Sequence, residues 1–264
     1  MALKAKLYRA YDLGVVAAAA LAAPVPYRHR WRALRLIGRL LMPIARGIGR
    51  YRDDYAAEGL VTVEEYVFEF ALMRATQLGL GFEPRLSHDG LEMLDEALAS
   101  GKPVMLVGVH AMLLYLAGRY LMERGCDFIA PRSTFNPPVM GKPGSYYSYL
   151  PFDQSNAMLR LTRMMQPGRL ITALIDGDRN GRRTIAVPIG AIDVPISYPL
   201  LKLGVDRGAA ILFFHPRLIG DRVELRWRRA DEANGLDGVI ASLGEFLLDQ
   251  TAARSITTKP PGAR

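Results

Sequence analysis

Short apolar runs alternate with longer amphipathic runs from about residue 60 onward. Continuous apolar runs bounded by turn residues are typical of strands buried on both faces, and a 3.6-residue period is typical of helices that pack on a sheet. The predicted buried strands cover residues 103–109, 126–131, 169–175, 184–189 and 209–215. The predicted helices cover 62–78, 89–101, 111–124, 155–166, 198–206 and 236–252, and the alternating run at 222–228 predicts an edge strand.

This order of elements predicts an α/β fold, with a mostly parallel central sheet flanked by helices on both faces. The Pro-, Gly- and Tyr-rich segment at 136–153 is predicted to be a long loop. We expect three parts in the chain: an N-terminal helical segment over 1–52, an α/β domain over 53–255 and a disordered tail over 256–264.

The N-terminal segment begins with an apolar, alanine-rich stretch at residues 13–25. A helix that spans a bilayer needs about 20 apolar residues, so this stretch is too short to be assigned as a transmembrane helix. We expect a retained hydrophobic helix, and a cleaved signal peptide is the alternative. The basic residues that follow oppose translocation, which favours the retained helix.

Residues 31–50 predict a second helix, apolar on one side and rich in arginine on the other, with a kink or break at Pro43. Such a helix is either an ordinary surface helix or an interfacial helix that binds anionic lipid or an acidic partner. The predicted apolar side consists of Trp31, Leu34, Ile37, Leu41, Ile44 and Ile48.

The charge of the chain is concentrated in this segment. Residues 1–52 hold eleven Lys or Arg against Asp12 alone, a net charge of +10, whereas all 264 residues sum to +8. The remainder is therefore −2, which argues against a uniformly basic nucleic-acid-binding surface. Cys126 is the single cysteine, which excludes an internal disulfide framework and a cysteine-rich metal site and fits reducing surroundings.

His110 lies where the strand 103–109 ends and the helix 111–124 begins. Ligands of open α/β sheets bind at the carboxyl ends of the strands, and a helix N-terminus disfavours imidazolium and keeps the ring able to accept a proton. His110 is therefore a candidate general base. The alternative is a partly buried histidine that donates a hydrogen bond to a backbone carbonyl.

A second candidate cluster is LIDGDRNGRR at 174–183, where Asp176 and Asp178 follow a predicted strand. Paired carboxylates could hold a metal or act as a base, but the glutamate that closes a calcium loop is absent, and turn formation explains the stretch equally well. The remaining histidines, His29, His88 and His215, have no partner at ligand spacing, so no metal site is expected.

Several blocks, taken in order, resemble the bacterial late acyltransferases of lipid A biosynthesis, within the lysophospholipid acyltransferase superfamily. VGVHAMLLYLAG at 107–118 occupies the place of that family's His-x4-Asp/Glu motif. The resemblance runs from the N-terminal hydrophobic segment to about residue 229. The other matching blocks are Pro131-Arg132, Asn136-Pro137, Asp176-Gly177-Asp178 with Gly181, VPIG at 187–190 with Pro195, and GAAILFFHPR at 208–217.

The resemblance implies transfer of a fatty acyl group from an acyl carrier protein or CoA thioester to a hydroxyl or amine of a lipid, glycolipid or related acceptor, without a cofactor. It implies a peripheral or N-terminally anchored protein on the cytoplasmic face of the inner membrane, where helix 31–50 would bind the anionic surface. Catalysis would fall to His110 as the base, with Tyr115 orienting it. The residues expected to bind substrate are Arg132, Asn136, Asp176, Asp178 and Arg179.

Tyr115 stands where the family has Asp or Glu. A tyrosine hydroxyl can accept a hydrogen bond from the imidazole ring, but it is neutral at pH 7 and cannot stabilise imidazolium. Three outcomes follow: catalysis with a more reactive acceptor or another carboxylate, a degenerate protein that binds an acyl chain or carrier, or a thioester hydrolase. The carboxylates that could substitute are Asp153, Asp176 and Asp178.

Overall fold

The computed structural model describes eight stretches of the chain, and its described residues form two compact units. The first unit draws on residues 1–85, 111–115 and 220–222, and the second draws on the rest of the chain. The described residues are 2–48, 63–109, 113–132, 147–151, 156–175, 184–189, 192–219 and 222–257.

In its described residues the first unit has three helices that pack on one another: α1 (Ala2–Ala22), α2 (Tyr27–Gly47) and α4 (Val63–Gln77). Aromatic rings fill the space between them, with the Trp31 and Phe68 ring centroids 6.1 Å apart. Arg74 of α4 forms an ion pair with Asp12 of α1 at 3.4 Å. No helix in the described part of the chain is long and apolar enough to cross a membrane.

Helix α2 continues through Pro43 to Gly47, so of the predicted kink or break, the break does not occur. Its buried side is narrower than the helical wheel indicates. Trp31, Leu34 and Ala45 are buried, whereas Ile44, which the wheel assigns to the apolar side, is 51% exposed. The exposed surface of α2 therefore combines leucine with arginine; it includes Leu36, Leu40, Ile44, Arg32, Arg35, Arg39 and Arg46.

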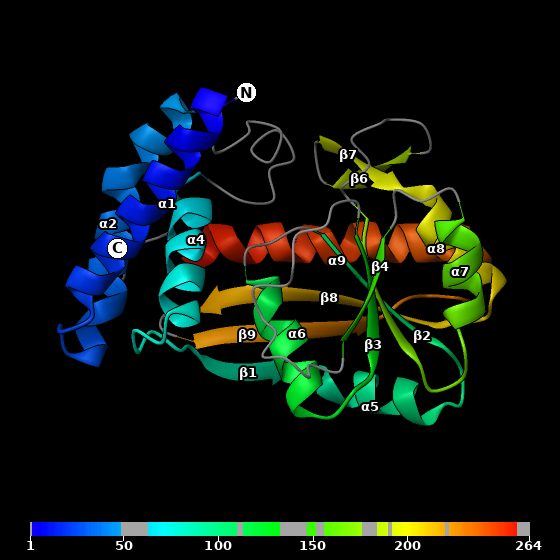
Figure 1. Ribbon diagram of the computed structural model, residues 1–264. Helices are drawn as coiled ribbons and strands as arrows, with labels where there is room; N and C mark the ends of the chain where they lie inside the picture. The colour runs from blue at the N-terminus through cyan, green and yellow to red at the C-terminus, as the bar shows by residue number, and fades with distance from the viewer. Residues whose placement is uncertain are drawn as a thin grey trace. The chain divides into compact units, whose positions relative to one another are not determined.

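The second unit contains a seven-stranded sheet with the strand order β1-β9-β8-β2-β5-β3-β4 (Figure 1). Strands β8, β2, β5, β3 and β4 run parallel to one another in that order. The sheet and its helices confirm the predicted α/β class with a mostly parallel sheet. The strands are β1 (Arg85–Asp89), β2 (Val104–Gly108), β3 (Phe128–Arg132), β4 (Tyr147–Pro151), β5 (Leu170–Leu174), β8 (Ala210–Ile219) and β9 (Arg222–Arg229).

Strands β1 and β7 (Ile192–Ser197) were not predicted, and three further strands differ from the prediction. The predicted edge strand 222–228 is β9, which lies inside the sheet because β1 covers it. Strand β4 falls within the segment predicted to be a loop. The predicted strand 184–189 is β6 (Thr184–Ile189), which pairs with β7 (Ile192–Ser197) in a separate antiparallel hairpin and not in the parallel sheet.

Helices cover both faces of the sheet. Gly204 of α8 (Tyr198–Asp206) lies against Met105 of β2, and Phe246 of α9 (Gly235–Thr257) packs on Phe213 of β8. The parallel register of β2 and β8 pairs Met105 with Ile211 and Val107 with Phe213, so α8 and α9 share one face. Helix α5 (Leu91–Ala99) lies on the other side of the sheet from α9, as Figure 1 shows. Two further helices are α6 (Leu114–Glu123) and α7 (Ala157–Met164).

Candidate functional site

The strand order reverses between β2 and β5, which are neighbours in the middle of the sheet. From β2 the chain passes through α6 to β3, on one side of the pair, and from β5 it passes through α8 to β8, on the other side. In open α/β sheets, the crevice outside the carboxyl ends of two such strands is where ligands bind. The fold therefore places its candidate site at the carboxyl ends of β2 and β5.

Main-chain hydrogen bonds fix this edge of the sheet. The amide of Ile175 donates to the carbonyl of Gly108 at 3.0 Å, and the amide of Ser197 donates to the carbonyl of Ile175 at 2.6 Å. Ser197 is the residue before α8. The two hydrogen bonds therefore link the end of β2 to the end of β5, and the end of β5 to the start of α8. These two main-chain hydrogen bonds hold the three segments at fixed spacing.

Gly108 sits in a crowded position at the end of β2. A Cβ added there would lie 2.9 Å from Cε1 of Phe214 and 3.1 Å from the carbonyl oxygen of Phe214. The Phe214 ring in turn stacks on Trp227, with the centroids 5.9 Å apart. Glycine thus allows the last residue of β2 to lie close against Phe214 of β8.

Most of the site residues predicted from the sequence lie outside the described residues. His110 comes two positions after Gly108, and Asp176 comes two positions after Leu174, the residue that pairs with Gly108. Arg132 is the last residue of β3, the strand on the other side of β5. The predicted residues outside the described parts are His110, Asn136, Asp153, Asp176, Asp178 and Arg179.

Tyr115 is the one predicted site residue whose side chain the structure describes. It lies in the first turn of α6 and is 7% exposed. Leu116 and Ala117, the next residues of α6, are buried as well. Tyr115 groups with the first unit, whereas α6 from Leu116 onward belongs to the second unit.

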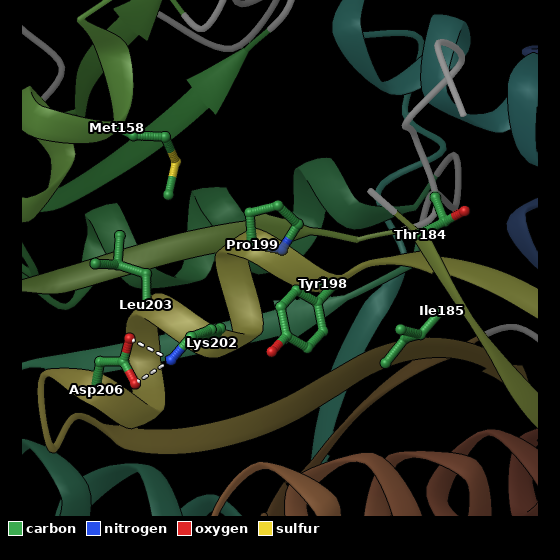
Figure 2. Close-up of a pocket in the computed structure, with 8 residues that line it drawn as sticks. All are labelled: Met158, Thr184, Ile185, Tyr198, Pro199, Lys202, Leu203 and Asp206. Atoms are coloured by element: carbon green, nitrogen blue, oxygen red, sulfur yellow. Dashed lines mark hydrogen bonds and ion pairs between the residues drawn. The ribbon is translucent and has the colours of Figure 1, made fainter. Parts of the chain in front are cut away.

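The structure adds a cavity that the sequence did not indicate. Its volume is about 600 Å³, and its walls come from α7, β6 and α8 (Figure 2). Apolar side chains form most of the wall, among them Met158, Ile185 and Leu203. Thr184, Tyr198, Pro199, Lys202 and Asp206 complete the lining.

The polar part of the cavity is concentrated on α8. Lys202 Nζ contacts both carboxylate oxygens of Asp206, at 2.7 Å and 2.8 Å, and this contact raises the pKa of Lys202. In Figure 2 the Tyr198 ring lies between this ion pair and Ile185. The residues that line the cavity come from three separate elements, so no local motif marks them.

A second cluster of titratable groups lies toward the amino ends of the parallel strands. The rings of His88 and Tyr120 are 4.1 Å apart between centroids, and Arg124 forms an ion pair with Asp95 at 2.6 Å. Burial lowers the pKa of His88, and the neighbouring Arg124 lowers it further. Burial likewise raises the pKa of Cys126, which follows α6 and precedes β3.

Within the described stretches, no three His, Cys, Asp or Glu side chains come together as a metal-binding group. Comparisons with protein-family models and with curated proteins find no match to this chain.

Proposed function

We propose that this protein is an acyltransferase, which moves a fatty acyl group from a carrier-protein or CoA thioester to a hydroxyl or amine, with His110 as the general base. The observation that carries the proposal is the reversal of strand order at β2 and β5, because the chain reaches His110 directly beyond that edge. The order and spacing of the family-like sequence blocks support the same activity.

In the proposed reaction, the His110 imidazole accepts the proton of the acceptor's O–H or N–H group. The acceptor's oxygen or nitrogen then attacks the thioester carbonyl and forms the new ester or amide bond. As the C–S bond breaks, the thiolate takes the proton back from the imidazolium and leaves as a free thiol. The reaction needs no cofactor beyond the acyl thioester.

Asp176 is the best candidate for the carboxylate that the His-x4-Tyr motif lacks. Strands β2 and β5 are parallel and in register from Val104↔Leu170 to Gly108↔Leu174. His110 and Asp176 each follow their strand by two residues, and neighbouring strands are about 4.8 Å apart. We therefore assign Asp176 the role of stabilising the imidazolium of His110, while Tyr115 keeps the role of orienting the ring.

We also propose that helices α1 and α2 bind the anionic surface of a membrane. Leu13 and Leu21 of α1 are 69% and 81% exposed, and Leu40 of α2 is 68% exposed. Exposed leucines with arginines on the same pair of helices are the combination found in interfacial helices, which insert their apolar side chains and bind lipid phosphates with their basic ones. Such binding would bring the site to a lipid acceptor.

Transfer assays with substituted proteins test the catalytic assignment. Purified protein is incubated with acyl carrier protein and CoA thioesters and with a panel of hydroxyl and amine acceptors. His110→Ala is expected to abolish transfer, and Asp176→Asn to lower kcat by about 10²- to 10⁴-fold, the range typical of general acid–base catalysis. Tyr115→Phe should lower kcat less than Asp176→Asn does.

The same assay separates the alternatives. Transfer that survives His110→Ala would overturn the base assignment. Release of thiol without acceptor would identify a thioester hydrolase. If neither the wild-type protein nor Tyr115→Glu transfers an acyl group while the carrier still binds, the protein is a binding protein and not an enzyme.

A further inference from the structure

The cavity between α7, β6 and α8 begins at the candidate reaction edge. Tyr198 and Pro199 of its wall form the first turn of α8, directly after Ser197. Ser197 is hydrogen-bonded to Ile175, and Ile175 to Gly108. The cavity therefore starts two main-chain hydrogen bonds from the end of β2 and extends along α8 to Asp206, about 12 Å away at 1.5 Å per residue.

The lining of the cavity fits a ligand that is partly apolar and charged at one end. Met158, Ile185, Pro199 and Leu203 give the cavity its apolar wall, whereas Lys202, in the middle of α8, pairs with Asp206 at the last residue of that helix, and both are about half exposed. A plain alkyl chain would cover that ion pair without giving it hydrogen bonds, which costs free energy. A phosphopantetheine arm has methyl and methylene groups and two amides, with a thioester at one end and a phosphate at the other. Its apolar groups would lie along the apolar wall of the cavity, and its phosphate would lie at the charged part.

The surface at the far end of the cavity is basic. Arg160 and Arg163 of α7 and Lys202 of α8 are exposed, and the exposed Arg207 donates to the carbonyl of Thr162 at 3.3 Å and so ties the end of α8 to α7. Over α7 and α8 through Arg207, four basic residues stand against Asp206 alone, a net charge of +3.

An apolar side chain lies among these charges. Leu159 of α7 is 53% exposed, and it stands next to Arg160 in the sequence. A basic rim around an exposed leucine is complementary to a small acidic protein that contributes its own apolar contact. We name this patch the α7 surface; it consists of Leu159, Arg160, Arg163, Lys202 and Arg207.

Resting on the proposed acyl transfer, we infer that the cavity takes the phosphopantetheine arm of an acidic acyl carrier protein, which docks on the α7 surface. The thioester end of the arm would reach the carboxyl ends of β2 and β5, and its phosphate would lie near Lys202. Lys202 has three N–H donors, of which Asp206 takes two, so one remains for the phosphate.

Binding measurements on the full chain test this inference. Fluorescently labelled carrier protein is titrated in its holo form, which has the arm, and in its apo form, which lacks it; free coenzyme A is a third probe. Arg160→Glu/Arg163→Glu should weaken binding of both carrier forms at least tenfold at low salt and change coenzyme A binding less than twofold. Leu203→Trp fills the cavity and should weaken binding of the holo carrier and of coenzyme A, but not of the apo carrier.

The matched control is Arg28→Glu/Arg32→Glu on α2, which makes the same charge change on another unit of the protein. If this pair weakens carrier binding and the α7 pair does not, the carrier docks on the N-terminal helices and the inference is wrong. Equal binding of holo and apo carrier to the wild-type protein would overturn the assignment of the cavity. Should Leu203→Trp fail to fold, Ile185→Trp fills the cavity from β6.

The outcomes also separate this inference from the proposed function. His110→Ala should leave carrier binding unchanged while it abolishes transfer. If no transfer is detected but the α7 and cavity variants bind as expected, the proposed activity fails and the carrier site stands. If transfer occurs but the same variants bind carrier and coenzyme A normally, the carrier site fails and the activity stands.

Discussion

Gly204 of α8 lies directly on Met105 of β2, and a Cβ added to the glycine would be 2.8 Å from the Met105 sulfur. Met105 is fully buried, so a methyl group at position 204 would require the packed Met105 side chain to shift. This close approach sets how near α8, and with it one wall of the cavity, lies to the sheet.

Gly204→Ala is therefore expected to lower the free energy of unfolding by about 1–3 kcal/mol, because overpacking outweighs the gain in helix propensity. Gly14→Ala in α1, where a Cβ would meet nothing within 4 Å, should instead raise the stability by up to about 1 kcal/mol. Thermal unfolding of the two variants measures the contrast. A rise in midpoint for both would show that α8 can move away from Met105.

His88 is expected to make folding sensitive to mild acid. Its pKa is lowered in the folded protein, first by burial and then by Arg124, so below about pH 6.5 the unfolded chain binds more protons than the folded one. The stability contributed by neutral His88 is thus present above the unfolded pKa and is lost as the pH falls below it. Urea unfolding at pH 7.5 and pH 5.5 should show a smaller loss for His88→Gln than for the wild type.

His29→Gln serves as the control for this experiment, because His29 is exposed on α2. It should leave the difference between the two pH values unchanged. If His88→Gln and His29→Gln change the stability difference between pH 7.5 and pH 5.5 equally, groups other than His88 cause the acid sensitivity.

Cys126 is expected to react slowly with thiol reagents. Burial raises its pKa, and Asp95 adds to that rise while Arg124 opposes it, so little thiolate is present at neutral pH. Iodoacetamide labelling should be slower in the folded protein than in urea, and slower still in Arg124→Gln. Mass spectrometry follows the labelling directly, since Cys126 is the single cysteine. Faster labelling of the folded protein would contradict the assignment.

Binding to lipid vesicles should depend on the arginines of α2. Each arginine near an anionic surface contributes about 1 kcal/mol, so Arg32→Gln/Arg46→Gln should weaken binding to phosphatidylserine-containing vesicles roughly 30-fold. Flotation with and without anionic lipid, at low and high salt, measures this. Arg160→Gln/Arg163→Gln on α7 also removes two positive charges and should have little effect. Vesicle binding that changes with neither salt concentration nor lipid charge would rule out the electrostatic part of the proposal.

The parallel strands could be predicted because burial on both faces requires continuous apolar runs, as in VMLVG of β2 and LITAL of β5. Strand β1 could not be predicted in this way. Its sequence, RLSHD, has one apolar residue among five, and it forms through pairing with β9 at the edge of the sheet. Pairing partners far away in the sequence leave no periodic pattern.

As with the strands, only part of the candidate site could be predicted from the sequence. His110 and Asp176 follow apolar strands, so the order of the elements predicts that both come after the carboxyl ends of strands, and this prediction falls outside the described residues. The adjacency of β2 and β5 could not be predicted, because it depends on the chain first building β3 and β4 before it returns. The cavity could not be predicted from the sequence either, because Met158, Ile185 and Leu203 come from three elements.

The hydrogen bonds that link Gly108, Ile175 and Ser197 use main-chain atoms alone. The frame of the site therefore does not depend on which side chains follow the strands, and mutation can exchange those side chains without rebuilding the sheet. The same independence makes this edge a suitable place to introduce new catalytic groups by design.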